Sequence, residues 1–394
     1  MTPSARIADR QSQHFLRLLA ALRPYWRSDR NLPARLQRLF VANPAFGARD
    51  RRLYRELVFT AVRHLPWIEP LLDTQLDEAV RVTAWLAADT KDTSAFRAAL
   101  ATGEPPAGDP TDLLPAWFRE HCPAAFAPAE LATLNRRAPL WLRLQTDAPE
   151  TVLAEFAGLG WKFSPSPVLP GTLRLDSDAD VTKAEAYRTG QIEVQDLGSQ
   201  MVLAAAPIAS GGRWFDACAG AGGKTLQLAR LLGPNGHVDA HDIRPAALAE
   251  LQTRAHRAGL TNIRIVARPA QEGYHGVLVD APCSGTGTWR RAPHLKWTTR
   301  PADIAAHATQ QLALLLEFAP SVRPGGLLLY ATCSLSRIEN EHVFTAFLAA
   351  ARGFAPVPLR ERFGFPDDGL ALTVLPARHD TDGFFVAAFR RDTG

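Results

Sequence analysis

Two cysteines lie in short motifs that each follow an apolar run. Cys283 belongs to VLVDAPCSGTG, which begins at Val277, and Cys333 belongs to YATCS, which begins at Tyr330. A third motif, DACAGAGGKT, begins at Asp216 and precedes both. Thiolates are strong nucleophiles, and glycines let the backbone approach a ligand closely. The combination indicates cysteine-driven group transfer beside a bound cofactor.

The elements that must position these motifs begin after residue 191, where short apolar runs alternate with helical stretches. This alternation predicts a doubly wound, mainly parallel α/β sheet. The expected strands are 214–218, 237–241, 263–267, 276–280 and 327–332, and the expected helices are 224–232, 245–258, 304–319 and 338–351. Cys283 then follows the fourth strand and Cys333 ends the fifth. Both should lie with the glycine loop at the carboxyl edge of the sheet.

The glycine loop matches neither common phosphate-binding pattern. A Walker loop needs a glycine where Cys218 stands, and a dinucleotide fingerprint needs one at Thr225. A nucleoside cofactor without a phosphate to cradle therefore remains. Asp242, at the end of the second strand, is placed to accept hydrogen bonds from ribose hydroxyls. The same residue could also cap the helix that begins near Pro245.

Two thiols at neighbouring strand ends suit methyl transfer to a pyrimidine, although a lone buried cysteine is commonly just a small apolar residue. Carbon-5 of cytosine is a poor nucleophile, but a thiolate that adds to carbon-6 converts the ring into a reactive enamine. One cysteine would be this nucleophile. The other would assist release by acid or base action. Asp280 would bind the polar edge of the ring and stabilise its activated form.

Composition excludes several other classes of protein. Of 394 residues, 46% are hydrophobic and 21% charged, which predicts a folded chain with a full core. The four cysteines are scattered and form no CxxC pair, so neither a disulfide framework nor a zinc site is expected. No secretory leader or membrane span is expected either. These features favour a reducing cytoplasm.

Positive charge is concentrated near the N-terminus. Residues 1–63 hold thirteen arginines and four acidic residues, whereas the whole chain carries only +4. Such a unit attracts a phosphate-rich partner, although a solvated arginine face would look the same. Helical periodicity and a polar connector predict a helical domain over 1–110, a bridging α+β subdomain over 111–190 and a Rossmann-like catalytic domain over 191–394.

The motifs together resemble the bacterial Sun/RsmB group of RNA cytosine-5 methyltransferases. VLVDAPCSGTGTWRRAPHLKW and YATCSLSRIENE are similar to the family's fourth and sixth motifs. RAPLWLR from Arg137, VQD from Val194 and DGFFVAAFRR from Asp382 are matched as well. ARDRRLYRELVFTAVRHLPWIEPLL from Ala48 resembles the NusB-like RNA-binding unit that begins RsmB proteins. The resemblance runs nearly end to end and is weakest between residues 70 and 135.

This resemblance implies a class I S-adenosylmethionine-dependent methyltransferase fold with an N-terminal all-α NusB-like domain. It implies Cys333 as the nucleophile, Cys283 as the release residue and Asp280 as the base-binding carboxylate. The residues implied to hold S-adenosylmethionine are Cys218, Ala219, Gly220, Ala221, Gly222, Gly223, Lys224, Asp242 and Asp280.

Cations and aromatic residues alternate after the Cys283 loop. Arg290, Arg291 and Lys296 are interleaved with Trp289 and Trp297, which suits phosphates and a flipped-out base of RNA. A structural loop with solvated arginines is the alternative. The expected function is methylation of carbon-5 of a cytidine in RNA, and the NusB-like unit favours ribosomal RNA. A transfer RNA methyltransferase and a non-catalytic, RNA-binding ribosome assembly factor of the same fold are the alternatives. A monomer without metal is expected.

Three departures from the family pattern affect these expectations. Gly220-Ala221 stands where the family usually has Ala-Pro. No acidic residue follows the third strand at 267–269 to contact the adenine, so that contact is either lost or taken by Gln271 or Glu272. His294 replaces the usual acidic residue before Lys-Trp.

Overall fold

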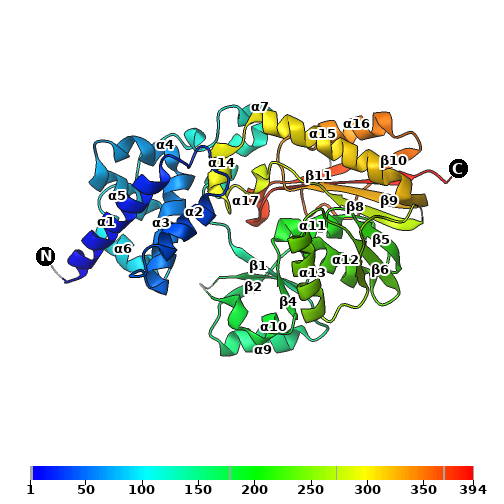
Figure 1. Cartoon of the computed structure of the whole chain (residues 1–394), viewed down its shortest axis with the longest axis horizontal. Helices are drawn as coiled ribbons and strands as arrows, with labels where there is room; N and C mark the ends of the chain where they lie inside the picture. The colour runs from blue at the N-terminus through cyan, green and yellow to red at the C-terminus, as the bar shows by residue number, and fades with distance from the viewer. Residues whose placement is uncertain (1–2, 177–178, 272, 367–368, 394) are drawn as a thin grey trace. The chain divides into compact units, whose positions relative to one another are not determined.

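A mainly parallel sheet dominates the second half of the chain in the computed structural model, which describes residues 3–176, 179–271, 273–366 and 369–393 (Figure 1). Its strands run in the order β10-β12-β9-β8-β5-β6-β7, and β11 pairs with β12. The bounds are β5 Gly212–Asp216, β6 Gly236–Ala240, β7 Ile263–Ile265, β8 Tyr274–Asp280, β9 Val322–Thr332, β10 Phe354–Val357, β11 Ala371–Val374 and β12 Phe384–Arg391. β5 to β9 pair in parallel, whereas β10, β11 and β12 pair antiparallel.

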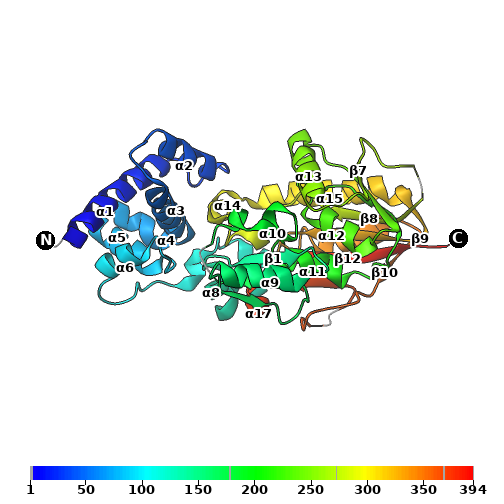
Figure 2. The same cartoon turned by 90° about the horizontal axis from the view of Figure 1, so that it is seen from below.

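Alternating side chains bury the two faces of this sheet under different helices. Trp214, Leu278 and Leu329 share one core cluster with residues of α11 and α12. Their neighbours in sequence, such as Phe215, pack on the opposite face with residues of α15 and α16. Successive side chains of a strand point to opposite faces, so near-continuous apolar runs form a sheet that is covered on both sides. The helices are α11 Leu197–Ala205, α12 Gly223–Leu232, α13 Pro245–Arg257, α15 Pro301–Phe318, α16 Glu341–Ala350 and α17 Pro376–His379 (Figure 1, Figure 2).

A smaller antiparallel sheet precedes the large one, with strand order β2-β3-β1-β4. Its elements are β1 Leu140–Leu144, α9 Pro149–Gly158, β2 Phe163–Pro165, β3 Thr172–Leu175, α10 Glu185–Arg188 and β4 Ile192–Val194. Leu142, Phe156 and Ile192 are fully buried in a core of their own. This sheet occupies most of the predicted bridging segment.

The first part of the chain is helical. Phe15, Leu19 and Leu22 on α1 pack with Leu57 and Ala61 on α3 in one apolar core, as helical spacing predicts. The helices are α1 Pro3–Leu22, α2 Leu32–Val41, α3 Ala48–Arg63, α4 Leu65–Ile68, α5 Leu76–Leu86, α6 Ser94–Leu100, α7 Phe118–His121 and α8 Pro128–Leu134. Short 3-10 helices are η1 Glu69–Leu72, η2 Pro110–Leu113, η3 Pro123–Phe126, η4 Val181–Lys183, η5 Thr286–Thr288 and η6 Ala319–Ser321.

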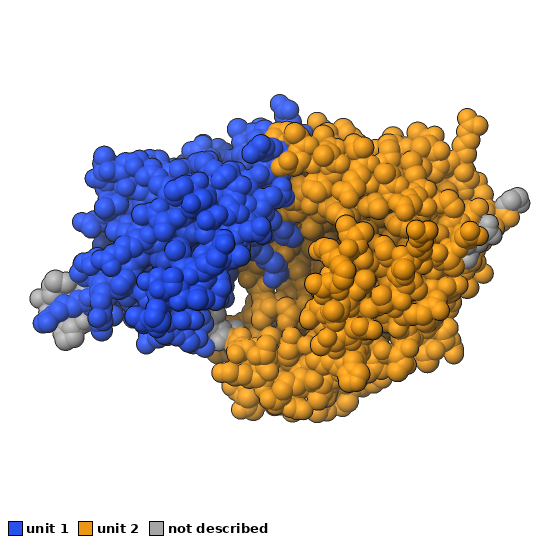
Figure 3. Space-filling view, viewed as in Figure 1, with its two compact units in different colours: residues 1–137, 288–300 blue, residues 138–287, 301–394 orange. Residues whose placement is uncertain are grey.

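The chain divides into two units at places that differ from the predicted boundaries (Figure 3). Unit 1 comprises residues 1–137 together with 288–300, and unit 2 comprises 138–287 with 301–394. The helical unit therefore extends past residue 110, and it includes α14, Pro293–Thr298, from the segment after the Cys283 loop. The small sheet and the large sheet belong to the same unit. Sequence order could not reveal that the 288–300 segment packs with helices far away in the chain.

Candidate active site

The glycine loop joins β5 to α12 at the carboxyl edge of the large sheet. Asp216 ends β5, and its carboxylate accepts hydrogen bonds from the Cys218 N–H at 3.3 Å and the Thr225 hydroxyl at 2.7 Å. Gly222 has a φ of +90°, and a Cβ there would lie 2.8 Å from the side chains of Leu226 and Leu251. Only glycine fits this position without strain. The loop is thus closed by the first and last residues of its own motif.

Asp242 follows β6 and lies against the glycine loop. One carboxylate oxygen accepts the Gly220 N–H at 2.8 Å and Arg244 Nη2 at 3.0 Å, while the other accepts Arg244 N and Nε, both at 2.9 Å. The Arg244 hydrogen bond is the main cause that lowers the pKa of Asp242 to about 2. The Asp242 side chain is 5% exposed and that of Arg244 is 67% exposed. Asp242 therefore lies where a carboxylate that binds ribose hydroxyls was predicted. The exposed guanidinium of Arg244 covers it.

Asp242 does not cap the following helix. Arg244 is the N-cap residue of α13, and Asp242 instead bonds the Arg244 N–H two residues on, as in an Asx turn. The alternative role that the sequence allowed for this aspartate is therefore not the one observed.

Three carboxylates lie around the loop, and two of them are paired with Lys224 and Arg244. Burial is the main cause that raises the pKa of Cys218, and the charges of Asp216, Asp280 and Asp242 act in the same direction. Burial also raises the pKa of Asp216, to about 7. A Cβ at Gly223 would meet nothing within 4 Å, so free space adjoins the first residue of α12. The loop can accommodate a ligand that carries positive charge.

The two predicted cysteines lie together. β8 and β9 are parallel and pair Asp280 with Ala331, so Cys283 and Cys333 leave the sheet at the same edge. Their sulfurs are 3.3 Å apart. The hydrogen bond to Cys333 is the main cause that raises the pKa of Cys283 well above its ordinary value, followed by burial. Both causes favour the protonated form of Cys283.

Asp280 and Lys224 connect the cysteine edge to the glycine loop. Lys224 Nζ lies 2.8 Å from Asp280 Oδ2 and 5.1 Å from the centre of the Phe384 ring. Burial is the largest single influence on Lys224 and acts to lower its pKa. The charge and the hydrogen bond of Asp280, together with smaller charge effects, outweigh burial and raise the pKa. Attraction between Lys224 and the Cys333 sulfur acts in the same direction. A fixed ammonium group thus lies within electrostatic reach of Cys333.

A buried glutamate that was given no role from the sequence also belongs to this site. Glu339 is fully buried and hydrogen bonds to Ser284 and Ser334, the residues that directly follow the two cysteines. The signal was present, because Glu339 lies in the IENE stretch after YATCS. Spacing alone could not show that its side chain turns back to both loops.

The segment after β7 contains no replacement carboxylate among residues 266–271. Gln271 is exposed, and Glu272 lies outside the described residues. The Val266 carbonyl interacts with His241 Nδ1 at 3.2 Å, and the Ala270 N–H donates to the Tyr274 hydroxyl at 3.1 Å. The prediction that Gln271 or Glu272 contacts an adenine stays a prediction.

The three cations predicted to bind RNA differ in exposure. Arg290 and Lys296 are each only 1% exposed, whereas Arg291 is exposed. Lys296 Nζ donates to the Arg63 carbonyl and to Asn135 Oδ1, both at 2.8 Å, and burial lowers its pKa well below the ordinary value. Arg290 Nη2 donates to the Arg137 carbonyl at 3.3 Å. The burial of Arg290 and Lys296 corrects the prediction that they contact phosphates, since both hold segments of unit 1 together. Arg291 remains a candidate for a phosphate contact.

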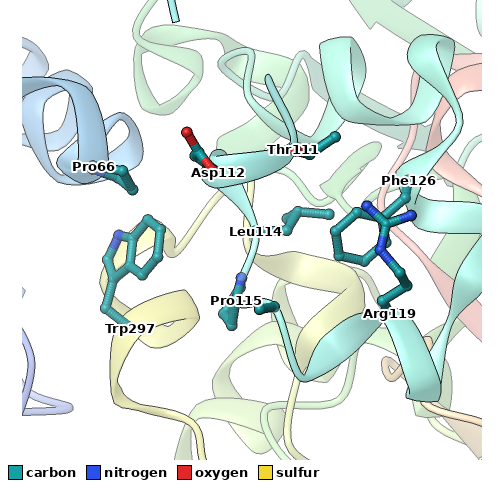
Figure 4. Close-up of a pocket in the computed structure, with 9 residues that line it drawn as sticks. Pro66, Thr111, Asp112, Leu114, Pro115, Arg119, Phe126 and Trp297 are labelled. Atoms are coloured by element: carbon teal, nitrogen blue, oxygen red, sulfur yellow. The ribbon is translucent and has the colours of Figure 1, made fainter. Parts of the chain in front are cut away.

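The aromatic residues of this segment take two different environments within unit 1. Trp289 is buried, whereas Trp297 is half-buried and lines a pocket of about 380 Å³ (Figure 4). The Arg119 guanidinium lies 4.1 Å from the centre of the Phe126 ring in the same pocket. His294 is buried, and its Nε2 interacts with the Arg30 carbonyl at 3.1 Å. The pocket therefore carries Trp297 on one side and the stacked Arg119 and Phe126 on the other (Figure 4).

Two further classes of feature are absent from the described residues. None of the helices in that part of the chain combines the length and the apolar character needed to cross a bilayer. Nor do His, Cys, Asp or Glu side chains at described positions gather in threes or more to form a metal site.

Comparison with known proteins agrees with this arrangement. The family model described as 16S rRNA methyltransferase RsmB/F matches residues 202–390. The probable ribosomal RNA small subunit methyltransferase B of Bacillus subtilis is 37% identical over 219 residues, which cover 52% of this chain and 49% of that protein. Ribosomal RNA small subunit methyltransferase B of Xylella fastidiosa (strain Temecula1) is 32% identical over 290 residues, which cover 71% of this chain and 67% of the relative. The chain thus spans about half to two thirds of the length of the curated relatives it matches.

Solved structures show the same fold. The crystal structure of PH0851 superposes with a TM-score of 0.72 at 23% sequence identity. The matched region covers 90% of this chain and 93% of the PH0851 chain. The crystal structure of NSun6 from Pyrococcus horikoshii with SFG has a TM-score of 0.63 at 21% identity and covers 70% of this chain and 98% of its own. The predicted α/β fold class with an N-terminal helical region is confirmed. The NusB-like character of that region stays a prediction.

Proposed function

Because the chain belongs to the RsmB/F family of 16S rRNA methyltransferases, we propose that it methylates carbon-5 of a cytidine in ribosomal RNA, with S-adenosylmethionine as the methyl donor. The observation that carries this proposal is the 3.3 Å separation of the Cys283 and Cys333 sulfurs beside a glycine loop. A purely structural cysteine pair would not need a buried lysine, paired with Asp280, within electrostatic reach of Cys333.

The residues of the loop fit S-adenosylmethionine. The three carboxylates around Cys218 suit a positively charged sulfonium, and Asp242 suits ribose hydroxyls once Arg244 moves aside. The proposed binding residues are Cys218, Ala219, Gly220, Ala221, Gly222, Gly223, Lys224, Asp242 and Asp280. When bound, the cofactor supplies an electrophilic methyl group.

Cys333 is the proposed nucleophile. Its sulfur would form a bond to carbon-6 of the cytosine, and the electrons of the ring double bond would make carbon-5 nucleophilic. Lys224 lies close enough to interact with the Cys333 thiolate before attack. Asp280, which is held by Lys224, would bind the polar edge of the base. Attack perpendicular to the ring requires the base to leave its stack.

Cys283 is the proposed release residue. Release requires the carbon-5 proton to pass to solvent while the bond between carbon-6 and the Cys333 sulfur breaks, which restores the ring double bond. Because Cys283 keeps its proton and lies 3.3 Å from Cys333, it can donate a hydrogen bond to the departing thiolate. We assign it this acid role.

RNA is the proposed macromolecular partner. The arginine-rich first 63 residues, exposed Arg291 and the pocket beside Trp297 suit phosphates and a stacked base. The names of the matched relatives favour small-subunit ribosomal RNA over transfer RNA. The cytoplasm is the proposed location, because a ribosomal RNA substrate would be met there.

Covalent trapping with Cys283→Ala tests the proposal. The variant is incubated with S-adenosylmethionine and either small-subunit ribosomal RNA or transfer RNA, and the products are separated by denaturing gel electrophoresis. Since release should stall after methyl transfer, a nuclease-sensitive band of retarded protein is expected with ribosomal RNA. Wild type should incorporate methyl groups and leave little adduct.

Two control variants make the result specific. Cys333→Ala should give neither adduct nor methyl transfer, because the attacking sulfur is missing. Cys122→Ala removes a buried thiol of unit 1 and should behave as wild type. An adduct with transfer RNA alone would overturn the substrate. No methyl incorporation by wild type, together with retained RNA binding, would favour the non-catalytic assembly factor.

A further inference from the structure

The carboxylate of Glu339 forms hydrogen bonds with both cysteine loops. It is fully buried. Oε1 accepts hydrogen bonds from the Ser284 N–H at 2.8 Å and from Gln311 Nε2 at 3.1 Å. Oε2 accepts hydrogen bonds from the Ser284 hydroxyl and from the Ser334 hydroxyl, the latter at 2.6 Å. Neutral donors thus hold a buried negative charge.

The hydrogen-bond partners of Glu339 connect this carboxylate to the two reactive cysteines. Ser284 and Ser334 directly follow Cys283 and Cys333, so one side chain bonds the backbone N–H and hydroxyl of the residue after Cys283 and the hydroxyl of the residue after Cys333. The neighbouring residue Asn340 reinforces the arrangement, because its amide donates to the Ser334 carbonyl at 2.9 Å and accepts from the Thr332 hydroxyl at 2.7 Å. A carboxylate that only filled the core would not need to reach both loops.

Burying a carboxylate costs free energy unless its hydrogen bonds are satisfied. An apolar residue would fill the same volume without that cost, which suggests a use for the charge. Glu339 is one of the groups that raise the pKa of Cys283, after the hydrogen bond to Cys333, burial and the charge of Cys333. The charge therefore acts on Cys283 as well as on the loop geometry.

We propose that Glu339 is a positioning residue that holds the Cys283 and Cys333 loops at the separation that the two-cysteine reaction requires. The proposal rests on the function proposed above and adds a residue to it. Its buried charge has a second effect, since it adds to the causes that raise the pKa of Cys283.

Glu339→Gln tests the inference because glutamine keeps the shape and removes the charge. Its amide oxygen can still accept from the Ser284 N–H and Gln311 Nε2, but its amide nitrogen can only donate, so the two serine hydroxyls must turn from donors to acceptors. Glu341→Gln is the matched control, since Glu341 is exposed in the first turn of α16 and undergoes the same substitution. Both variants are first compared with wild type by thermal unfolding, to establish that they fold.

The main measurement is the rate at which iodoacetamide alkylates Cys283 at pH 8, read by peptide mass spectrometry in a Cys333→Ser background. It needs neither RNA nor cofactor, so it can fail or succeed independently of the proposed function. Removing a nearby like charge lowers a pKa by about one unit, which raises the thiolate fraction about tenfold. Glu339→Gln should therefore react about tenfold faster than Glu341→Gln. Equal rates in the two folded variants would overturn the electrostatic part.

The spacing is tested by diamide-driven disulfide formation between Cys283 and Cys333 in the otherwise unchanged chain. Glu339→Gln should slow this reaction several-fold and lower kcat with little change in KM for RNA, whereas Glu341→Gln should match wild type. If Glu339→Gln does not fold, Ser334→Ala removes one of the hydrogen bonds to Glu339, together with the contacts of the same hydroxyl to Ser284, Thr286 and the Ser336 N–H, and should also slow disulfide formation. Wild-type disulfide rates in the folded variants would refute the positioning role.

Discussion

Replacing Gly287 by alanine should disrupt the active-site edge of unit 2. A Cβ at this position would lie 2.1 Å from the carbonyl oxygen and 2.6 Å from the carbonyl carbon of Gly383. The Gly287 N–H donates to the Cys333 carbonyl at 3.0 Å, and the Gly383 N–H donates to the Gly287 carbonyl at 2.8 Å. Backbone atoms must therefore separate by about 1 Å, since no flexible side chain can move away. The end of the Cys283 loop would shift relative to Cys333.

The size of the effect follows from these contacts. Weakening two backbone hydrogen bonds costs about 0.5–1.5 kcal/mol each, and overpacking adds about 1–3 kcal/mol. A total of about 4 kcal/mol lies in the middle of this range. In a domain of about 150–250 residues, 1 kcal/mol shifts Tm by about 2–4 °C. Gly287→Ala should therefore lower the Tm of unit 2 by about 10 °C.

Gly158→Ala is the matched control for this prediction. Gly158 is the last residue of α9, its φ is not positive, and a Cβ there would meet nothing within 4 Å. Alanine is favoured over glycine in a helix by about 0.5–1 kcal/mol, so this variant should keep or slightly raise Tm. Scanning calorimetry measures both, and diamide crosslinking of Cys283 and Cys333 reports the local shift. Similar Tm values for the two variants would refute the claim that the approach to Gly383 is rigid.

Two further predictions concern the carboxylates around the glycine loop. Arg244→Met should tighten S-adenosylmethionine binding by up to about fivefold, because displacing an exposed guanidinium from Asp242 costs at most about 1 kcal/mol. Calorimetry should show no change for Arg323→Met, and weaker binding by Arg244→Met would contradict the prediction. Because burial raises the pKa of Asp216 from 3.8 to about 7, wild type should lose up to about 1.4 kcal/mol of unfolding free energy per unit as pH rises from 4 to 7. In urea unfolding, the free energy of unfolding of Asp216→Asn should depend less steeply on pH than that of wild type, whereas exposed Asp147→Asn should keep the wild-type slope. Equal slopes for Asp216→Asn and wild type would count against this explanation.

Local sequence patterns predicted the core of unit 2 closely. The expected strand 276–280 lies inside β8, Tyr274–Asp280, and the expected strand 327–332 is the second half of β9, Val322–Thr332. The expected helix 245–258 corresponds to α13, Pro245–Arg257. Apolar runs and turn residues are local signals, and a parallel sheet brings strand ends to one edge. That is why Cys283 and Cys333 could be placed together before any coordinates.

The environment of each side chain was less predictable. Arg290 and Lys296 follow the Cys283 loop among tryptophans, which favoured an RNA contact, yet both are buried in unit 1. Arg291, between them in sequence, is exposed. A run of cations does not indicate which members will find backbone carbonyls far away in the chain, such as those of Arg63 and Arg137.

The sequence by itself therefore determined the reactive groups and the sheet edge that carries them. Only the tertiary structure decided what surrounds those groups: the turn of Glu339 toward both cysteine loops, the cover of Arg244 over Asp242, and the membership of residues 288–300 in the helical unit. The physical reason is the distance along the chain between the residues that interact. Secondary structure follows from neighbours a few residues apart, whereas burial, hydrogen-bond partners and pKa shifts depend on contacts between residues that only the folded chain brings together.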